Sequence, residues 1–299
     1  LRNDGSAPAV AGGYFITSGT RVITVGSLTA VYTPQPILFI KAGTTSTVNS
    51  SVTGHTLSTS YGPLYLETGS TCTLNGNVIG GAGSQSDGII MESGCTLTVN
   101  GDVAGGTHTS AAVGIVTAAS CTVNINGNVT ATNGSGAYAL NLATGGTATI
   151  VGNVTVGSAG SAIYAAATTT LSITGSVTGG SGTSTIAVLT YGTATVVGNV
   201  TGGSGTNAYG VGIYGGTLSV TGDVQTGASA GYPAGVAVIS TGCSFDHVGD
   251  LKARVGSGNG YPPLILLAGS IWWMGGTIEN GANPSYMGNL CINPAYGVV

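Results

Sequence analysis

Charge is the scarcest property of this chain of 299 residues. Only 5% of the residues are Asp, Glu, Lys or Arg, against roughly 25% in an average soluble domain. The formal net charge is -4, and the five Lys and Arg residues are scattered along the sequence. Binding to nucleic acid needs clustered cations on one surface. We therefore expect no nucleic-acid partner.

Long apolar runs and metal-binding motifs are missing as well. The apolar stretch 261–274 is interrupted by Pro and Gly, so it is too short to cross a membrane as a helix, and we expect no membrane insertion. Five Cys residues form no metal-binding pattern, and we expect neither a metal nor a cofactor. The chain starts at Leu1 without an initiator Met or a signal sequence, so its targeting cannot be read.

The chain is instead rich in glycine and in small and β-branched residues. The chain has 55 Gly, and 42% of its residues are hydrophobic, mostly Val, Ile, Leu and Ala set among Thr, Ser and Asn. This mixture favours strands and tight turns, and no amphipathic helix can be recognised. The apolar content is sufficient for a long core.

One short phrase recurs along nearly the whole chain. It reads TATIVGNVTVG at 147–157 and TATVVGNVTGG at 193–203. Its glycine marks a register at successive positions 23 to 27 residues apart: Gly26, Ser50 in place of Gly, Gly76, Gly101, Gly127, Gly152, Gly175, Gly198, Gly222, Gly249 and Gly275 or Gly276. Self-similarity with such a period is typical of a solenoid.

Each period contains three short strand-like pieces, for example 209–214, 217–221 and 223–225. The sequence therefore predicts an all-β fold, a single-stranded right-handed parallel β-helix of about eleven coils with roughly 23–27 residues and three short strands per coil. The pattern resembles the right-handed parallel β-helix family over nearly all of the chain. We expect a cap or linker at 1–20, the repeats at 21–269, and a cap or docking segment at 270–299.

Alternation along each strand predicts the residues that point inward. The first strand offers the pairs Leu64/Leu66, Ile89/Met91, Leu140/Leu142, Ile163/Ala165 and Ile186/Val188. The second offers Cys72/Leu74, Leu97/Val99, Val123/Ile125, Ala148/Ile150, Leu171/Ile173, Ala194/Val196 and Leu218/Val220. The third offers one apolar residue per coil, from Leu28 and Val52 to Val224 and Leu251.

The same register places pairs of Thr on the outer face of the second strand. These candidate binding residues are Thr71, Thr73, Thr96, Thr98, Thr122, Thr147, Thr149, Thr193, Thr195 and Thr217. A two-column array of Thr-x-Thr resembles the face of β-solenoid ice-binding proteins, which implies an ice-binding site. The alternative is that Thr simply has a high strand propensity and stacks well in an exposed ladder.

The residue after each register mark is polar, as at Asn77, Asp102, Asn128, Asn153 and Asn199. We expect this column to support the corner of each coil by hydrogen bonds. The triplets that begin at Asn128, Asn153 and Asn199 also fit the acceptor motif for N-glycosylation.

Glu67 and Glu92 occupy equivalent outward places in adjacent coils, so their carboxylates are expected to lie side by side. Paired carboxylates serve acid catalysis or cation binding in other proteins. Lys and Arg are remote from them in sequence, and the three His fall in different coils. We therefore expect a solvated surface pair and no catalytic residues.

Cys95 and Cys121 each precede a mark by six residues. Their predicted spacing would suit a disulfide. They would equally serve as small residues that fill a corner column beside Ser70 and Gly146.

The last thirty residues contain both Trp residues and none of the recurring phrases. A cap is one interpretation of this segment. A docking surface for another subunit is the other, and its candidate residues are Trp272, Trp273, Met274, Tyr286 and Tyr296.

The phrases TLTVNGDV and GNVTGG resemble β-helical segments of phage tail fibres and tailspikes, of virion decoration proteins and of bacterial adhesins. This resemblance implies a non-enzymatic structural and adhesive rod in a virion or on a cell surface, where it binds a host glycan or neighbouring subunits of a fibre, capsid or surface assembly. A homotrimer is a common form of such fibres. The alternatives are an ice-binding protein and, least favoured, a polysaccharide-degrading enzyme on the same fold.

Overall fold

The computed structural model describes residues 14–29, 36–54, 62–82, 87–107, 112–132, 137–157, 160–205, 208–227, 236–238, 242–252, 264–266, 270–273, 277–279 and 290–292. All regular structure among them is β-strand. The chain divides into two compact units, Leu1–Gly152 (unit 1) and Asn153–Val299 (unit 2).

The described residues of unit 1 form fifteen strands. They are β1 (Tyr14–Ile16), β2 (Thr20–Thr29), β3 (Leu38–Ile40), β4 (Thr45–Thr53), β5 (Leu64–Leu66), β6 (Thr71–Leu74), β7 (Val78–Ile79), β8 (Ile89–Met91), β9 (Thr96–Asn100), β10 (Val103–Ala104), β11 (Ile115–Thr117), β12 (Thr122–Asn126), β13 (Val129–Ala131), β14 (Tyr138–Leu142) and β15 (Thr147–Val151).

Unit 2 contains the remaining strands. They are β16 (Val154–Val156), β17 (Ser161–Ala165), β18 (Thr170–Thr174), β19 (Val177–Thr178), β20 (Ile186–Thr190), β21 (Thr193–Val197), β22 (Val200–Thr201), β23 (Tyr209–Ile213), β24 (Thr217–Thr221), β25 (Val224–Gln225), β26 (Val236–Val238), β27 (Ser244–Val248), β28 (Leu251–Lys252), β29 (Leu264–Leu266), β30 (Ser270–Trp273), β31 (Ile278–Glu279) and β32 (Leu290–Ile292).

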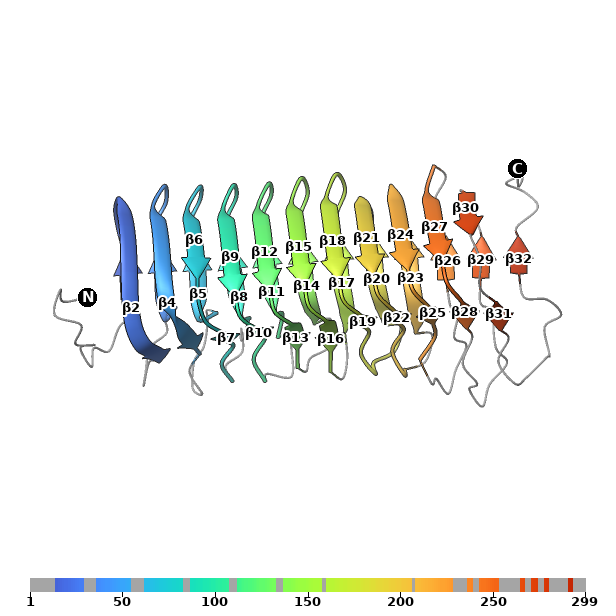
Figure 1. The fold of residues 1–299 in the computed structure, drawn as a ribbon, viewed down its shortest axis with the longest axis horizontal. Helices are drawn as coiled ribbons and strands as arrows, with labels where there is room; N and C mark the ends of the chain where they lie inside the picture. The colour runs from blue at the N-terminus through green and yellow to red at the C-terminus, as the bar shows by residue number, and fades with distance from the viewer. Residues whose placement is uncertain are drawn as a thin grey trace. The chain divides into compact units, whose positions relative to one another are not determined.

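Within each unit, the strands pair in parallel with the equivalent strands of the neighbouring turns. In unit 1 the first strands of the turns follow the order β1-β3-β5-β8-β11-β14, and in unit 2 the order is β17-β20-β23-β26-β29-β32. Figure 1 shows the strands of each unit side by side in chain order. This arrangement is a right-handed parallel β-solenoid. The predicted fold class is confirmed.

The number of regular turns is about eight, fewer than the eleven predicted. Two of the proposed corner marks, Gly26 and Ser50, lie inside the long strands β2 and β4. Both strands continue through the expected corner, although the pairing of β2 with β4 shifts register between Thr24 and Ser27, and neither mark has a positive φ. The last mark, Gly275 or Gly276, lies outside the described residues.

The corner glycines are required by geometry, as the sequence predicted. Gly198 has a φ of 149°, a conformation that is open almost only to glycine. A Cβ atom on Gly198 would also overlap the backbone carbonyl of Gly175 in the preceding turn. Positive φ and close backbone approach therefore act together at this corner.

The core consists of the inward columns that alternation predicted. The second-strand pairs and the third-strand residues are buried throughout, including Leu97, Val99, Val103 and Leu251. The predicted inward pair Ile186/Val188 is wrong. Val188 pairs with Val211 of the next turn, whereas Ile186 pairs with Tyr209. Ile186 is therefore only half-buried, and the inward pair is Val188 and Thr190.

The inward residues of unit 2 include an imidazole. His247 on β27 is only 1% exposed, and neither ring nitrogen has a hydrogen-bond partner among the described residues. Its ring stacks on Phe245 with centroids 5.4 Å apart. Burial, which outweighs the nearby backbone and the carboxylate of Asp223, holds the pKa of His247 below its ordinary value of 6.5.

Candidate binding face

The Thr residues predicted on the second strands do line up in columns. In unit 1, Thr71 pairs with Thr96 and Thr73 with Thr98, while Thr96 pairs in turn with Thr122 and Thr122 with Thr147. We call the outward residues of β4, β6, β9, β12 and β15, together with Asn75 directly after β6, the unit 1 Thr face. Its members are Thr45, Thr47, Asn49, Thr71, Thr73, Asn75, Thr96, Thr98, Asn100, Thr122, Asn124, Asn126, Thr147, Thr149 and Val151.

Unit 2 repeats this arrangement with different side chains. The outward residues of β18, β21, β24 and β27 form the unit 2 Thr face: Thr170, Ser172, Thr174, Thr193, Thr195, Val197, Thr217, Ser219, Thr221, Ser244, Asp246 and Val248. All of these residues are exposed or half-exposed. The predicted register is confirmed on both faces, and a role in binding stays a prediction.

Four residues of the third column of the unit 1 Thr face form an amide ladder that the sequence analysis missed. Asn75 donates from Nδ2 to Oδ1 of Asn49 at 2.6 Å, and Asn100 donates to Asn75 at 2.6 Å. Asn126 donates to Asn100 at 2.7 Å, and Asn49 itself donates to Thr24. We call Asn49, Asn75, Asn100 and Asn126 the Asn ladder. Its signal was available in the sequence, because each Asn directly precedes a register mark.

The polar column after each mark supports the corners, as predicted. In unit 1 the backbone N of Asn128 donates to Oδ1 of Asp102 at 2.7 Å. In unit 2 the backbone N of Ser176 donates to Asn153, and that of Asp223 to Asn199, both at 2.9 Å. The side-chain oxygens of Asn153 and Asn199 are thus engaged in holding the next turn.

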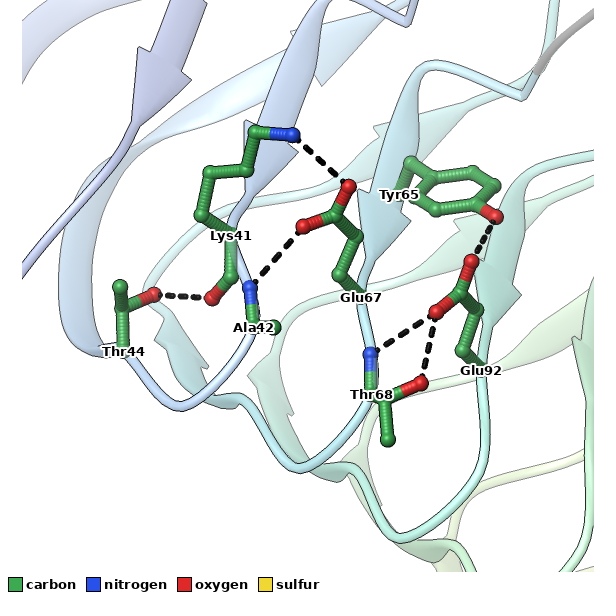
Figure 2. Close-up of polar contacts among 7 residues, drawn as sticks. All are labelled: Lys41, Ala42, Thr44, Tyr65, Glu67, Thr68 and Glu92. Carbon is green, nitrogen blue, oxygen red and sulfur yellow. Dashed lines mark hydrogen bonds and ion pairs between the residues drawn. The ribbon is translucent and has the colours of Figure 1, made fainter.

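Glu67 and Glu92 follow β5 and β8 in consecutive turns, as predicted, but each carboxylate is tied to the turn before it (Figure 2). Glu67 accepts hydrogen bonds from Nζ of Lys41 at 2.8 Å and from the backbone N of Ala42. Glu92 accepts from the hydroxyl of Tyr65 at 2.6 Å and from both N and Oγ1 of Thr68.

These contacts determine the charge state of both acids. The Lys41 ammonium lowers the pKa of Glu67. The Tyr65 hydroxyl, followed by Thr68, lowers the pKa of Glu92. Two carboxylates with lowered pKa values anchor turns and stay ionised at neutral pH.

The expectation that Lys and Arg are remote from these acids is wrong for Lys41. Residues 26 positions apart in sequence are neighbours in a solenoid with this period, so Lys41 lies one turn from Glu67 and forms an ion pair with it. Lys41 also sits 4.8 Å from the centre of the Phe39 ring. Distance along the chain was the wrong measure of proximity.

A second set of ion pairs strengthens the corners of unit 2. Lys252 contacts Asp223 at 2.9 Å and Asp250 at 2.8 Å. The same carboxylates accept backbone hydrogen bonds from the following turns, at Asp250 and Thr277. Hydrogen bonds from Lys252 lower the pKa of both carboxyl groups.

Cys95 and Cys121 are buried free thiols. Cys95 donates from Sγ to the carbonyl of Glu67 at 3.0 Å, and Cys121 donates to the carbonyl of Glu92 at 2.9 Å. The hydrogen bond with Cys95, together with burial, raises the pKa of Cys121. The second interpretation of the sequence, small residues that fill a corner column, describes this structure.

The docking candidates of the C-terminal segment lie largely outside the described residues. Met274, Tyr286 and Tyr296 are not described. Trp272 and Trp273 belong to β30 by their backbone, paired with Asp246 and His247 of β27. Their role in docking stays a prediction, as do the caps at 1–20 and 270–299.

Among the described residues, no group of three or more His, Cys, Asp or Glu is placed to hold a metal ion. The described part of the chain also contains no helix long and apolar enough to span a membrane. No family model, curated protein or solved structure matches the chain. The fold and its surfaces therefore carry the functional argument.

Proposed function

We propose that this protein is a non-enzymatic structural and adhesive component of a surface assembly, a viral fibre or a surface appendage, and that its Thr faces bind an uncharged glycan or a neighbouring subunit. The observation that carries the proposal is the in-register array of hydroxyl and amide groups on the second strands. Such an array offers regularly repeated hydrogen-bond donors and acceptors on a rigid β surface.

The charged side chains support the same interpretation. Glu67, Glu92, Asp223 and Asp250 are all engaged in holding adjacent turns together. These charged groups therefore stabilise the stacking of turns, whereas every residue of the unit 1 Thr face is uncharged. A neutral ligand loses little hydration on meeting such a face, while an ionic ligand would lose its water without gaining a counter-charge.

Binding to immobilised neutral and acidic polysaccharides tests the adhesive function. We expect retention on a neutral glycan and its loss in Thr98→Arg, which places a long charged side chain in the middle of the unit 1 Thr face. Thr130→Arg is the matched control, because Thr130 is a half-buried residue of β13, outside this face. Equal retention of both variants, or no retention of the unchanged protein, would contradict glycan binding through this face.

Fractionation of the source material tests the structural role. We expect the protein to co-purify at fixed stoichiometry with particles or with the cell envelope. Recovery only as a free soluble protein would refute an assembly component.

Ice binding is the second candidate, favoured by the side chains of the unit 2 Thr face. Its columns on β18, β21 and β24 contain only Thr, Ser and Val, so methyl and hydroxyl groups repeat at strand spacing. Thr193→Tyr with Thr195→Tyr should abolish any inhibition of ice growth, because the rings interrupt the flat array. Inhibition that survives this double substitution would remove the candidate.

A further inference from the structure

We propose that the unit 1 Thr face binds a linear, uncharged polysaccharide of β-1,4-linked sugars, which lies along the stack of turns over the Asn ladder. This inference rests on the proposed adhesive function and names the class of its ligand. The occupant follows from three properties of the ladder: spare hydrogen-bonding capacity, spacing and absence of charge.

The ladder leaves half of its hydrogen-bonding capacity free for a ligand. A side-chain amide carries two N–H donors and an oxygen with two lone pairs. Asn75 and Asn100 each use one donor and one acceptor for their neighbours in the ladder. Both residues are exposed. Each therefore presents one further donor and one further acceptor on the outer surface.

The spacing of the ladder selects a repeating ligand. Neighbouring strands of a sheet lie about 4.8 Å apart, so the paired donors and acceptors recur at that interval along the stack. A β-1,4-linked pyranose chain advances by nearly the same step per sugar, with hydroxyl groups along both edges of the chain. Each sugar can therefore meet one Asn, and consecutive sugars meet consecutive turns.

The Asn side chains are already ordered before any ligand arrives. Their amides are fixed by ladder bonds of 2.6 to 2.7 Å, so a ligand does not have to immobilise them, and this loss of side-chain freedom is a major cost of binding. Thr73 and Thr98 lie beside the ladder in the next column. Their hydroxyls add donors and acceptors, and their methyl groups add apolar contact.

The absence of charge decides which polymers fit. The segments 45–49, 71–75, 96–100 and 122–126 contain no charged residue. A neutral polymer is complementary to this surface. An acidic polysaccharide has no cation to meet there and would lose hydration from its carboxylates.

Calorimetric titration with cello-oligosaccharides and chito-oligosaccharides of two to six sugars tests the proposal. We expect affinity to rise with each sugar until the Asn ladder is covered and then to level off, with no binding of polygalacturonate. Asn100→Leu should weaken binding about tenfold, because it removes a donor and an acceptor from the centre of the ladder. Asn141→Leu is the matched control, because Asn141 is a half-buried residue of the first strand β14, outside both Thr faces, and this variant should bind as the unchanged protein does.

A second variant keeps the proposal testable if Asn100→Leu does not fold. Thr98→Val keeps the shape and strand propensity of the side chain and removes only the hydroxyl, so it should fold and bind several-fold more weakly. Affinity that does not depend on chain length, or that is unchanged in both variants, would overturn the proposal. Retention of short or branched neutral glycans with sensitivity to Thr98→Arg would overturn only the axial polysaccharide and leave the adhesive function standing.

Discussion

The two units have the same three-strand turns and differ in the side chains of their outward columns. On the second strands, the third outward column of unit 1 is the Asn ladder followed by Val151 on β15, whereas the corresponding column of unit 2 contains no Asn and reads Thr174, Val197, Thr221 and Val248. Val197 and Val248 are 49% and 44% exposed. In this column, unit 1 therefore links four of its turns by side-chain hydrogen bonds, whereas unit 2 presents the methyl groups of Thr and Val to solvent.

The edge where the first strand ends differs in the same way. In unit 1 it carries Lys41, Glu67 and Glu92, whose contacts join consecutive turns. In unit 2 the equivalent positions carry Tyr191 and Tyr214, whose rings stack with centroids 5.3 Å apart. The backbone register is the same, so an outward column can change from ionic to aromatic without any change to the fold.

The largest expected effect on stability comes from the corner glycines, which both units share. Gly101→Ala in unit 1 and Gly198→Ala in unit 2 should each destabilise the protein by about 2–4 kcal/mol, through a strained φ and overlap with the preceding turn. Chemical denaturation would measure the loss. Gly26→Ala is the control, because a Cβ atom there meets nothing within 4 Å. A loss in one unit only would show that the corners are not equivalent.

The next largest effect on stability concerns the core of unit 2, which contains the buried His247. His247→Leu should raise stability by about 1–3 kcal/mol at neutral pH, because it removes a buried imidazole without hydrogen-bond partners. The folded state holds this His neutral with a lowered pKa, while the unfolded chain takes up a proton below pH 6.5.

Stability of the unchanged protein should therefore fall as the pH drops below 6.5, with a slope of up to about 1.4 kcal/mol per pH unit from this group. Hydrogen exchange should show loss of protection around β24 and β27 first. The slope should shrink in His247→Leu, and an identical acid profile for the variant would contradict the role assigned to the imidazole.

A smaller effect tests the Asn ladder against its counterpart. Asn100→Leu should cost unit 1 about 1 kcal/mol, since two exposed amide hydrogen bonds are lost. Val197→Leu in unit 2 should change stability by less than about 0.5 kcal/mol. Thermal unfolding of the two variants would compare them. Equal costs would mean that the ladder adds nothing to the stability of its unit.

The smallest effect concerns the ion pairs. Lys41→Met should cost about 0.2–1 kcal/mol, as is usual for surface pairs, and should return the pKa of Glu67 toward its ordinary value. The contribution of Glu67 is present above its unfolded pKa and is lost as the pH falls through the lowered folded pKa. NMR titration of the Glu67 carboxyl would follow this shift. A Glu67 pKa that stays low in Lys41→Met would assign the shift to the Ala42 hydrogen bond alone.

The fold was predictable because every inward position repeats. Alternation of apolar residues at Leu97 and Val99, together with a glycine that only a corner explains, determines both register and strand order. The turn count was less predictable, since Ser50 resembles a mark in spacing but lacks the φ freedom of glycine. Ile186 was misplaced because alternation alone cannot separate two neighbouring apolar pairs in one strand.

The candidate surface was predictable only in part. The Thr columns follow from the register, but the Asn ladder and the Lys41 ion pair depend on contacts between turns. Such contacts appear only when positions about 25 residues apart are compared with one another. The docking candidates of the C-terminal segment stay predictions.

The corner hydrogen bonds have a direction along the chain. Asn153 accepts from Ser176, Asn199 from Asp223 and Asp250 from Thr277, so each side chain receives the backbone of the turn that follows it. During synthesis an earlier turn therefore already holds the acceptor that the next turn needs when it leaves the ribosome. Assembly can proceed by addition of one turn at a time to a finished template, in the direction in which the polypeptide is made.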